Sequence, residues 1–343
     1  MTEPANQDAV KLQNSLLEGS IPKGFSQEDP AHPGLRWLRT SSGVLVEQTF
    51  AEAFPMSFAR LIVTAETERW VEIAAVTFTG YATSVIGCDL EAGIERKLTP
   101  EETPDGRPGA ALLMFSFSRD QLAKAVVNRV GQCLLTCATT AVFDGWTQGD
   151  PQKRIPLGDG LRYFGDGYQM SKQLGDQRYW RIPVMDGEFV CEDSIGTGKG
   201  VAGGNLIFGG TTQAQTLLAA EEAVVAARSI PGVILPFPGG IVRSGSKVGS
   251  KYAGLRASTN DQFCPTIGAI HKDPLLPEGT VAVYEIVIDG VDFDAVERSM
   301  KAAFQSLLGA RGLTVISAGN YGGKLGPHHF PISRLGVDGL HSA

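Results

Sequence analysis

The stretch TVAVYEIVIDGVDFDAVERSMKAAFQSLLGARGLTVISAGN, residues 280–320, decides the fold. Its first part, TVAVYEIVIDG, is rich in β-branched and apolar residues and predicts a strand. The next part, DFDAVERSMKAAFQSLLGARG, carries apolar residues at helical spacing and ends in a glycine, so it predicts a helix with a defined stop. TVISAGN then predicts another strand. The stretch therefore reads as strand, helix, strand.

The pattern extends outward to the preceding segment. GNLIFGG predicts a strand, TQAQTLLAAEEAVVAARSI a helix and GVILPF a strand, and a long turn-rich segment from Pro238 to Pro277 follows. Together with the opening stretch, this gives the order β-α-β-β-α-β. The first half repeats that order, with strands in SFARLIVTA, TSVIGC, GAALLMFSFS and ATTAVFDG and helices in ETERWVEIAAVTFTG and SRDQLAKAVVNRVGQCLL. We predict an α+β fold of two tandem ferredoxin-like (split β-α-β) lobes with antiparallel sheets.

Three regions follow from this pattern. Residues 1–42 are mixed in pattern and contain four prolines, and they predict an N-terminal extension with a short amphipathic helix at Ala9–Leu17. Residues 43–150 form the first lobe. Residues 151–343 form the second lobe, with a C-terminal tail and with an inserted hairpin region in which apolar and polar residues alternate.

Composition narrows the class of protein. Of 343 residues, 43% are hydrophobic and 20% are charged, as is usual for a globular protein, and the net charge of −7 argues against a broad nucleic-acid-binding face. No apolar run approaches the ~18–20 residues of a membrane span. The N-terminus does not resemble a secretory signal, and five scattered cysteines do not suggest a disulfide framework. We expect a cytoplasmic protein that binds neither nucleic acid nor membrane.

The segment PFPGGIVRSGSKVGSK, residues 236–251, packs glycines, serines and three cations together and resembles a phosphate-binding loop. A P-loop places lysine before Ser or Thr, because the lysine reaches the phosphates and the hydroxyl meets magnesium. Here Ser246 precedes Lys247, and no strong helix pattern follows. The glycines of GTGKGVAGGN, residues 196–205, precede a strand instead of joining a strand to a helix, so they predict a flexible turn rather than a dinucleotide loop.

The spacing of cysteines and histidines in the sequence gives little support for a metal site or for a catalytic cysteine. Cys133 and Cys137 lie four residues apart on a predicted helix without a second pair at matching spacing, and His328 and His329 are adjacent. No combination gives a tetrahedral set, so we predict no metal site. No histidine stands in a recognisable relation to Cys191 or Cys264.

One acid and several asparagines are candidates for the site. Strand alternation places Glu285 on one face with three valines, where its pKa would rise and suit a general acid or a neutral hydrogen-bond donor. The alternative, equally consistent with the pattern, is that this face is open to water and that Tyr284, Ile286 and Ile288 on the other face form the core. Asn205, Asn260 and Asn320 fall in glycine- or serine-rich turns, where asparagine suits the turn itself or an amide-like substrate.

Seven blocks together resemble one family. In chain order they are TFAEAF (49–54), EETPDGRPG (101–109), FGDGYQ (164–169), PFPGGIVRSGSKVGSK (236–251), ASTNDQFCPT (257–266), VYEIVIDG (283–290) and SAGNYGGKLG (317–326). The chain resembles formylmethanofuran–tetrahydromethanopterin formyltransferases from about residue 49 to residue 326. The tail beyond Gly326 falls outside this resemblance.

The resemblance implies a reaction and its partners. It implies reversible formyl transfer between N5 of tetrahydromethanopterin, or its dephospho form, and the amine of a methanofuran-like carrier, with no metal and no covalent acyl-enzyme. Because the N-terminal extension is longer than that of the archaeal chains, the resemblance points to the bacterial version. That version is one component of a formyltransferase/hydrolase complex with a metallohydrolase in methylotrophic formaldehyde oxidation. Self-association as a dimer or tetramer is also implied.

The resemblance also implies the roles of the site residues. It makes Glu285 the catalytic group, protonated near the formyl oxygen. Because the carriers bear carboxylates, the cations of residues 236–251 would clamp one of them. Our candidate substrate-binding residues are Arg243, Ser246, Lys247, Lys251, Asn205, Asn260, Asn320 and Lys324. The alternatives are a nucleotide-using transferase and a non-catalytic scaffold subunit of a one-carbon complex.

Overall fold

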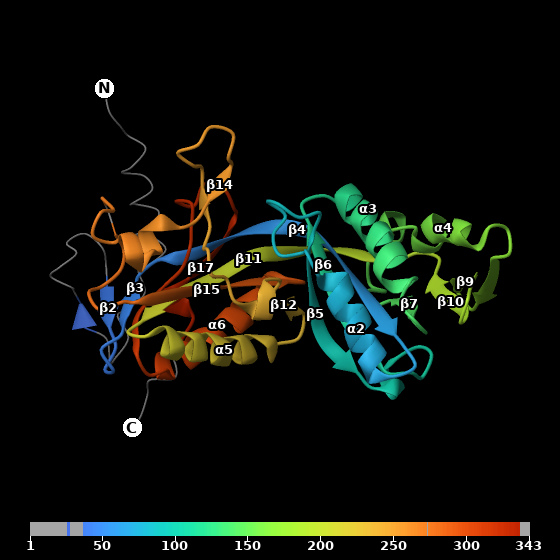
Figure 1. Ribbon diagram of the computed structural model, residues 1–343, viewed down its shortest axis with the longest axis horizontal. Coiled ribbons are helices and arrows are strands. Elements are labelled where there is room, and N and C mark those ends of the chain that lie inside the picture. The colour runs from blue at the N-terminus through green and yellow to red at the C-terminus, as the bar shows by residue number, and fades with distance from the viewer. Residues whose placement is uncertain (1–25, 28–36, 273, 337–343) are drawn as a thin grey trace. The chain divides into compact units, whose positions relative to one another are not determined.

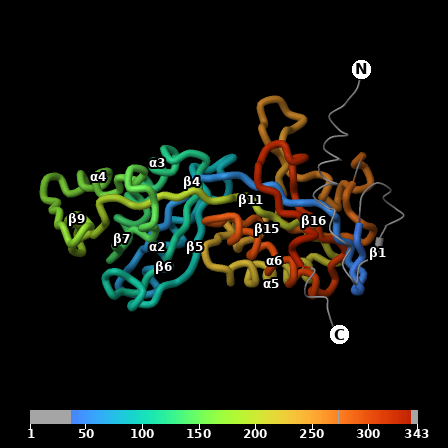
Figure 2. The backbone as a smooth tube through the Cα atoms, turned by 180° about the vertical axis from the view of Figure 1, so that it is seen from behind, coloured from blue at the N-terminus to red at the C-terminus, as the bar shows by residue number. Residues whose placement is uncertain are grey.

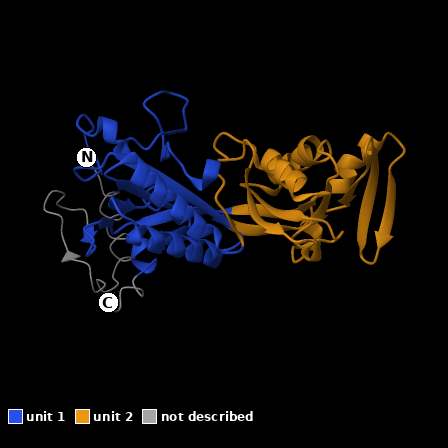
Figure 3. Cartoon of the chain, turned by 60° about the horizontal axis from the view of Figure 1, so that its bottom comes forward, with its two compact units in different colours: residues 1–55, 201–231, 237–343 blue, residues 56–200, 232–236 orange. Residues whose placement is uncertain are grey.

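The computed structural model describes residues 26–27, 37–272 and 274–336 (Figure 1). Two compact units are distinguished in Figure 3. Unit 1 comprises residues 1–55, 201–231 and 237–343, and unit 2 comprises residues 56–200 and 232–236. The fold is mixed α+β, with five α-helices among the described residues: α2 (Glu68–Thr79), α3 (Arg119–Arg129), α4 (Leu157–Leu161), α5 (Gln213–Arg228) and α6 (Phe293–Gly309).

Most strands belong to one unit, while β4 and β11 contribute residues to both. The strands of the described residues are β1 (Ser26–Gln27), β2 (Trp37–Arg39), β3 (Leu45–Glu47), β4 (Phe50–Thr64), β5 (Glu91–Leu98), β6 (Gly109–Ser116), β7 (Ala141–Asp144), β8 (Met170–Leu174), β9 (Gln177–Val184), β10 (Gly187–Glu192), β11 (Thr197–Gly210), β12 (Val233–Ile234), β13 (Lys247–Val248), β14 (Ala257–Ser258), β15 (Ala282–Gly290), β16 (Leu313–Ser317) and β17 (His328–Pro331).

Unit 2 is built on an antiparallel arrangement in which β6 lies between β5 and β4, and β4 in turn pairs with β7. Helices α2 and α3 pack on this sheet and bury a common apolar core with it. Strand β10 joins parallel to β7, and β9 and β8 follow as antiparallel hairpin strands. The predicted hairpins are therefore present. Their pairing with β7 places them in unit 2, whereas the predicted boundary at residue 150 assigned them to the second lobe.

The first helix of unit 2 confirms the predicted segment but shifts its buried face. Trp70 and Ile73, which stand at helical spacing with Ala74 and Phe78 in the predicted helix, are 37% and 38% exposed. Helix α2 instead buries Val71, Ala74, Ala75 and Phe78. The two alanines on this face let the helix approach the sheet closely.

The predicted strand TSVIGC is wrong. Residues 83–88 form a turn, and the strand begins only at Glu91. The cause lies in α3, where the Arg129 guanidinium donates to the carbonyls of Phe78, Gly80 and Tyr81 and to the carboxylate of Asp89. These bonds hold the end of α2 and the residues before β5 around one buried cation, so the intervening segment turns instead of extending.

Unit 1 carries the second helix pair. Strand β11 pairs antiparallel with β15 and β16, and β16 pairs parallel with β3. Helices α5 and α6 lie side by side along the sheet in both backbone views, and the buried Ser299 hydroxyl donates to the Ala227 carbonyl at 3.0 Å (Figures 1 and 2). Each helix begins at a capping side chain, Thr212 for α5 and Asp292 for α6.

The structure also tests the predictions for one glycine-rich segment and for one turn-rich segment. Residues 196–205, predicted as a flexible turn, lie almost entirely in β11, which has a bulge at Gly203, where φ is +98°. Residues 238–277 form the expected long loop, which contains short 3₁₀ turns and an antiparallel pair of two-residue strands, β13 and β14. The predicted helix at Ala9–Leu17 lies outside the described residues. None of the described helices is both long and apolar enough to cross a membrane.

Close packing of α6 on β11 gives a stability prediction. A Cβ added at Gly204 would lie 2.4 Å from Cγ1 of Val296 and 3.1 Å from the sulfur of Met300. We expect Gly204→Ala to lower the free energy of unfolding by about 1–3 kcal/mol, because the helix must shift to accommodate it. Urea denaturation measures this. Gly309→Ala is the matched control, because a Cβ there meets nothing within 4 Å; equal stability of the two variants would contradict the packing argument.

Candidate active site

The long loop of unit 1 joins the sheet beside Glu285. The Val242 amide donates to the Glu285 carbonyl at 2.7 Å, and the Glu285 amide donates to the Val242 carbonyl at 3.0 Å. This reciprocal pair is an isolated antiparallel bridge, so the chain adds one residue of sheet pairing to β15 before it turns away. The loop therefore starts from a fixed point beside the predicted catalytic acid.

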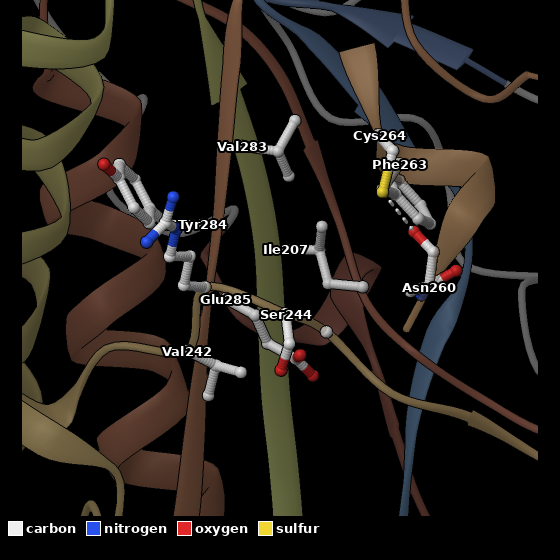
Figure 4. Close-up of a pocket in the computed structure, with 11 residues that line it drawn as sticks. Ile207, Val242, Ser244, Asn260, Phe263, Cys264, Val283, Tyr284 and Glu285 are labelled. Atoms are coloured by element: carbon white, nitrogen blue, oxygen red, sulfur yellow. Dashed lines mark hydrogen bonds between the residues drawn. The ribbon is translucent and has the colours of Figure 1, made fainter. Parts of the chain in front are cut away.

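The loop then closes over the face of the sheet that carries Glu285. On β11, Ile207 is the register partner of Glu285, and both line a small cavity with Val283 and with Phe263 of the loop (Figure 4). Glu285 is only 9% exposed. The two alternatives for this strand are thus resolved in part: Ile286 and Ile288 do form the core, yet Glu285 is also buried, because the loop covers what would otherwise be an open face.

This burial changes the chemistry of the acid. Burial raises the pKa of Glu285 to about 8. No opposing cause accompanies that shift, so the environment acts mainly by withholding water from the charged form. A carboxyl group in this setting stays protonated near neutral pH and can donate a hydrogen bond.

Three of the predicted site residues meet at this cavity. Arg243 and Asn260 line it together with Glu285. The backbone N–H of Asn260 donates to the carbonyl of Ser244, the residue after Arg243, at 3.3 Å. The cavity volume is about 30 Å³, which suits a water-sized group rather than a whole carrier. The arrangement brings a neutral acid together with two polar residues, Arg243 and Asn260, along a space for one small polar group.

The other loop cations are placed differently. The Lys247 ammonium bonds the Asp261 carboxylate at 2.5 Å, and His271 lies 3.4 Å from the other oxygen of Asp261. Lys251 and Lys324 are exposed, and their side chains make no hydrogen bond or ion pair with other parts of the chain that the structure describes. The charge of Lys247 is therefore partly satisfied within the loop, whereas the charges of Lys251 and Lys324 face solvent.

Two predicted asparagines support the backbone around the site. Asn205 donates to the carbonyls of Gly203 and Gly319 and accepts from the Gly319 amide at 2.5 Å. Asn320 donates to the Thr49 hydroxyl and the Phe50 carbonyl and accepts from the Gly322 amide. Both amides are thus engaged in shaping the segment after β16, and their contact with a carrier stays a prediction.

Sequence reasoning missed Tyr321 and Glu52. The Tyr321 hydroxyl is hydrogen-bonded to Ser246, and burial raises the pKa of this phenol, with Glu285 and Glu52 adding to the rise. Glu52 accepts four backbone hydrogen bonds from residues 321–326. One signal was available: both residues stand inside family-like blocks, and Glu52 is an acid between two alanines of a strand.

Metal ligation does not feature in this arrangement. Within residues 26–27, 37–272 and 274–336, no group of three or more His, Cys, Asp or Glu side chains is arranged to hold a metal ion. Cys264 lines the cavity, and its thiol donates to the Asn260 carbonyl at 3.4 Å.

Comparison of the chain with known protein families identifies the family to which it belongs. A family model described as formylmethanofuran-tetrahydromethanopterin formyltransferase matches residues 40–184, and the model of the proximal lobe of that family matches residues 187–335. The chain belongs to this family. It is therefore a formyltransferase, and the acid, the loop and the cavity described above all lie within the match to the proximal lobe.

Relatives of this formyltransferase are similar along most of the chain. A formylmethanofuran–tetrahydromethanopterin formyltransferase from Methylobacillus flagellatus is 54% identical over 86% of this chain and 98% of its own. The crystal structure of the Methylorubrum extorquens formyltransferase/hydrolase complex with methylofuran contains a chain that is 52% identical, with a TM-score of 0.82 over 86% and 97% of the two chains. The Methanosarcina barkeri enzyme is 44% identical, with a TM-score of 0.81 over 86% and 99%.

The raised pKa of Glu285 gives a prediction for stability. Between the ordinary value of 4.5 and about 8, the folded formyltransferase binds a proton at Glu285 that the unfolded chain releases. We expect the unfolding free energy of the wild type, relative to Glu285→Gln, to fall by at most about 1.4 kcal/mol per pH unit from pH 5 to 8 and then to level off.

Urea denaturation at pH 5, 6, 7, 8 and 9 measures this difference. The exposed Glu222→Gln on α5 controls for the loss of one carboxylate. A wild-type-to-variant difference at Glu285 that stays constant across the series would contradict the burial of a neutral acid.

Proposed function

We propose that this chain transfers a formyl group reversibly between N5 of tetrahydromethanopterin, or its dephospho form, and the amine of a methanofuran-like carrier. The transfer is direct attack within a ternary complex, without a covalent acyl-enzyme. The observation that carries this is Glu285, a buried acid whose pKa is about 8, at a cavity large enough only for a small polar group. That cavity accepts the reacting end of a carrier while the rest of it lies outside.

The mechanism needs positioning, oxyanion stabilisation and a proton path. Holding the two amines in line supplies most of the entropic advantage. The protonated Glu285 carboxyl donates to the formyl oxygen as the tetrahedral intermediate develops negative charge. Proton movement between the attacking and leaving nitrogens completes the transfer. Desolvation by Ile207, Val283 and Phe263 strengthens the hydrogen bond from the acid.

The loop cations and amides hold the carriers. Arg243, at the cavity, and Lys251 and Lys324, both exposed, are free to meet carboxylates of a carrier, and Lys247 does so by exchanging its bond to Asp261. Ser246 and the three asparagines 205, 260 and 320 complete the binding set that we propose.

We further propose that both lobes are ferredoxin-like. In unit 2 the strand order β7–β4–β6–β5, with α2 after β4 and α3 after β6, is the order of a split β-α-β unit. In unit 1, β11 lies between β16 and β15, and α5 and α6 both pack on β15. These arrangements support two lobes, although the predicted bounds of 43–150 and 151–343 differ from the two units, since residues 43–55 lie in unit 1 and residues 151–200 in unit 2.

The chain would act as one component of a bacterial formyltransferase/hydrolase complex in the cytoplasm, with a metallohydrolase that releases formate and with self-association. Support comes from the Methylorubrum relative, whose name makes it one of the subunits of such a complex. The test is an assay of the purified chain with both carriers. Turnover supports the proposal, whereas binding of the carriers without turnover favours the scaffold alternative.

Glu285 gives the sharpest prediction for activity. Because glutamine keeps the shape but its amide N–H is a much weaker hydrogen-bond donor to an oxyanion than a carboxyl O–H, we expect Glu285→Gln to retain carrier binding and to lose about 10²-fold or more in kcat. The wild-type kcat should also fall as pH rises through about 8, where the acid ionises. Steady-state rates from pH 6 to 10, with calorimetry for binding, measure both; unchanged turnover in the variant removes Glu285 from the mechanism.

Lys247 gives a prediction for binding. We expect Lys247→Ala to raise KM for one carrier about 10-fold while kcat at saturation changes about 2-fold or less, because the lost charge acts on bound carrier rather than on the reacting atoms. Kinetics with each carrier varied separately measure the split. Lys172→Ala, on the exposed hairpin strand β8, is the matched control. Equal losses in kcat and kcat/KM would indicate a direct catalytic role.

A further inference from the structure

Glu52 lies on β4 as a buried acid held by backbone rather than by a cation. It is 1% exposed, and its two flanking alanines, Ala51 and Ala53, are fully buried. Both carboxylate oxygens are satisfied by backbone N–H groups: one accepts from Tyr321 and Gly323 at 2.7 and 2.9 Å, the other from Leu325 and Gly326 at 2.6 Å each. A buried carboxylate is costly unless it is hydrogen-bonded in this way.

The same segment is fitted tightly around this carboxylate. The amide of Glu52 donates to the Gly319 carbonyl at 3.2 Å, and a Cβ added at Gly326 would lie 2.3 Å from the Ala53 carbonyl oxygen. Gly322 and Gly323 adopt φ of +72° and +69°, which turn successive amides toward one point. Residues 319–326 therefore form a loop organised by one acid; we call it the Glu52 loop.

The Glu52 loop reaches the candidate site through Tyr321. The Tyr321 ring lies 6.2 Å from the Phe54 ring, centroid to centroid, and its hydroxyl bonds Ser246 in the loop that joins β15 at Glu285. Gly245, the neighbour of Ser246, lines the cavity together with Glu285. Glu52, Tyr321 and Ser246 thus form a connected path inside unit 1 that ends one residue from the cavity of Glu285.

We propose that Glu52 is a positioning residue for formyl transfer, which holds the Glu52 loop so that Tyr321 fixes Ser246, and with it the adjoining residues 242–245 that line the cavity of Glu285. This rests on the proposed role of Glu285. Burial alone would raise the pKa of the Glu52 carboxyl, and the four N–H groups more than offset this and hold it below its ordinary value. The loop therefore keeps its charged organiser near neutral pH, where Glu285 is protonated.

A double-mutant cycle tests the path. Glu52→Gln replaces one acceptor oxygen by a donor that faces backbone N–H groups, and Tyr321→Phe removes only the hydroxyl. We expect about a 10-fold or greater loss in kcat/KM for Glu52→Gln, a smaller loss for Tyr321→Phe, and a double variant no worse than Glu52→Gln alone. Losses that multiply would show that Glu52 does not act through Tyr321 and would overturn the proposal, as would full activity of Glu52→Gln.

A second pair of variants keeps the test decisive if Glu52→Gln does not fold. Gly322→Ala strains the Glu52 loop at φ +72° without touching any neighbour, and Gly175→Ala applies similar strain at φ +59° in the β8–β9 hairpin. We expect both variants to lower the melting temperature by a similar small amount, and only Gly322→Ala to lower kcat/KM, by about 10-fold. Equal activity of the two overturns the proposal.

These outcomes are separate from those for the catalytic acid. Full turnover in Glu285→Gln removes the proposed role of that acid and leaves the comparison of Gly322→Ala with Gly175→Ala intact. Conversely, equal activity in the glycine pair removes Glu52 and leaves the result for Glu285→Gln standing. Binding of each carrier, measured by calorimetry on the same proteins, shows whether the Glu52 loop acts on ground-state binding or on turnover.

Discussion

The reciprocal hydrogen bonds between Val242 and Glu285 are the contact on which the site depends. They fix the start of the long loop, residues 238–277, to β15, and the loop then covers the sheet face that carries the Glu285 carboxyl. Without that cover the carboxyl would meet water and ionise well below neutral pH. The backbone contact thus determines the protonation state of a side chain on the same residue, and with it the kind of catalysis that the site supports.

Two buried glutamates of unit 1 show how environment separates their roles. Glu285 is buried among apolar groups, and its pKa is raised to about 8, whereas four backbone N–H groups hold the pKa of Glu52 below its ordinary value. The first can donate a proton or a hydrogen bond at neutral pH, and the second keeps a permanent charge that organises backbone. Residue type alone does not distinguish them; the number of N–H donors aimed at each carboxyl group does.

The sequence pattern correctly predicted those helices and strands that depend on neighbouring residues, through helix caps and apolar periodicity. Ser118 caps α3 by accepting from the Gln121 amide, and the helices and strands of residues 280–320 follow their apolar periodicity. The errors arose where a distant group intervened. Arg129 bends residues 83–88, which by composition predict a strand, and the pairing of β10 with β7 moves the hairpins into unit 2. Neither a buried guanidinium nor a strand pairing between distant segments leaves a local signature.

The same distinction applies to the site. The strand that carries Glu285 and the loop that carries Arg243 were both evident, because an acid among valines and a glycine-rich run with three cations are local features. The partner of Lys247 was not, since Asp261 lies outside that run and meets the lysine only when residues 247–248 and 257–258 pair. The protonation state of Glu285 was also undecidable from alternation, because both faces of β15 are buried, one by helices and one by a loop. The strands of this protein can therefore be predicted from local sequence, whereas the state of the catalytic acid depends on a loop, distant in sequence, that covers the sheet.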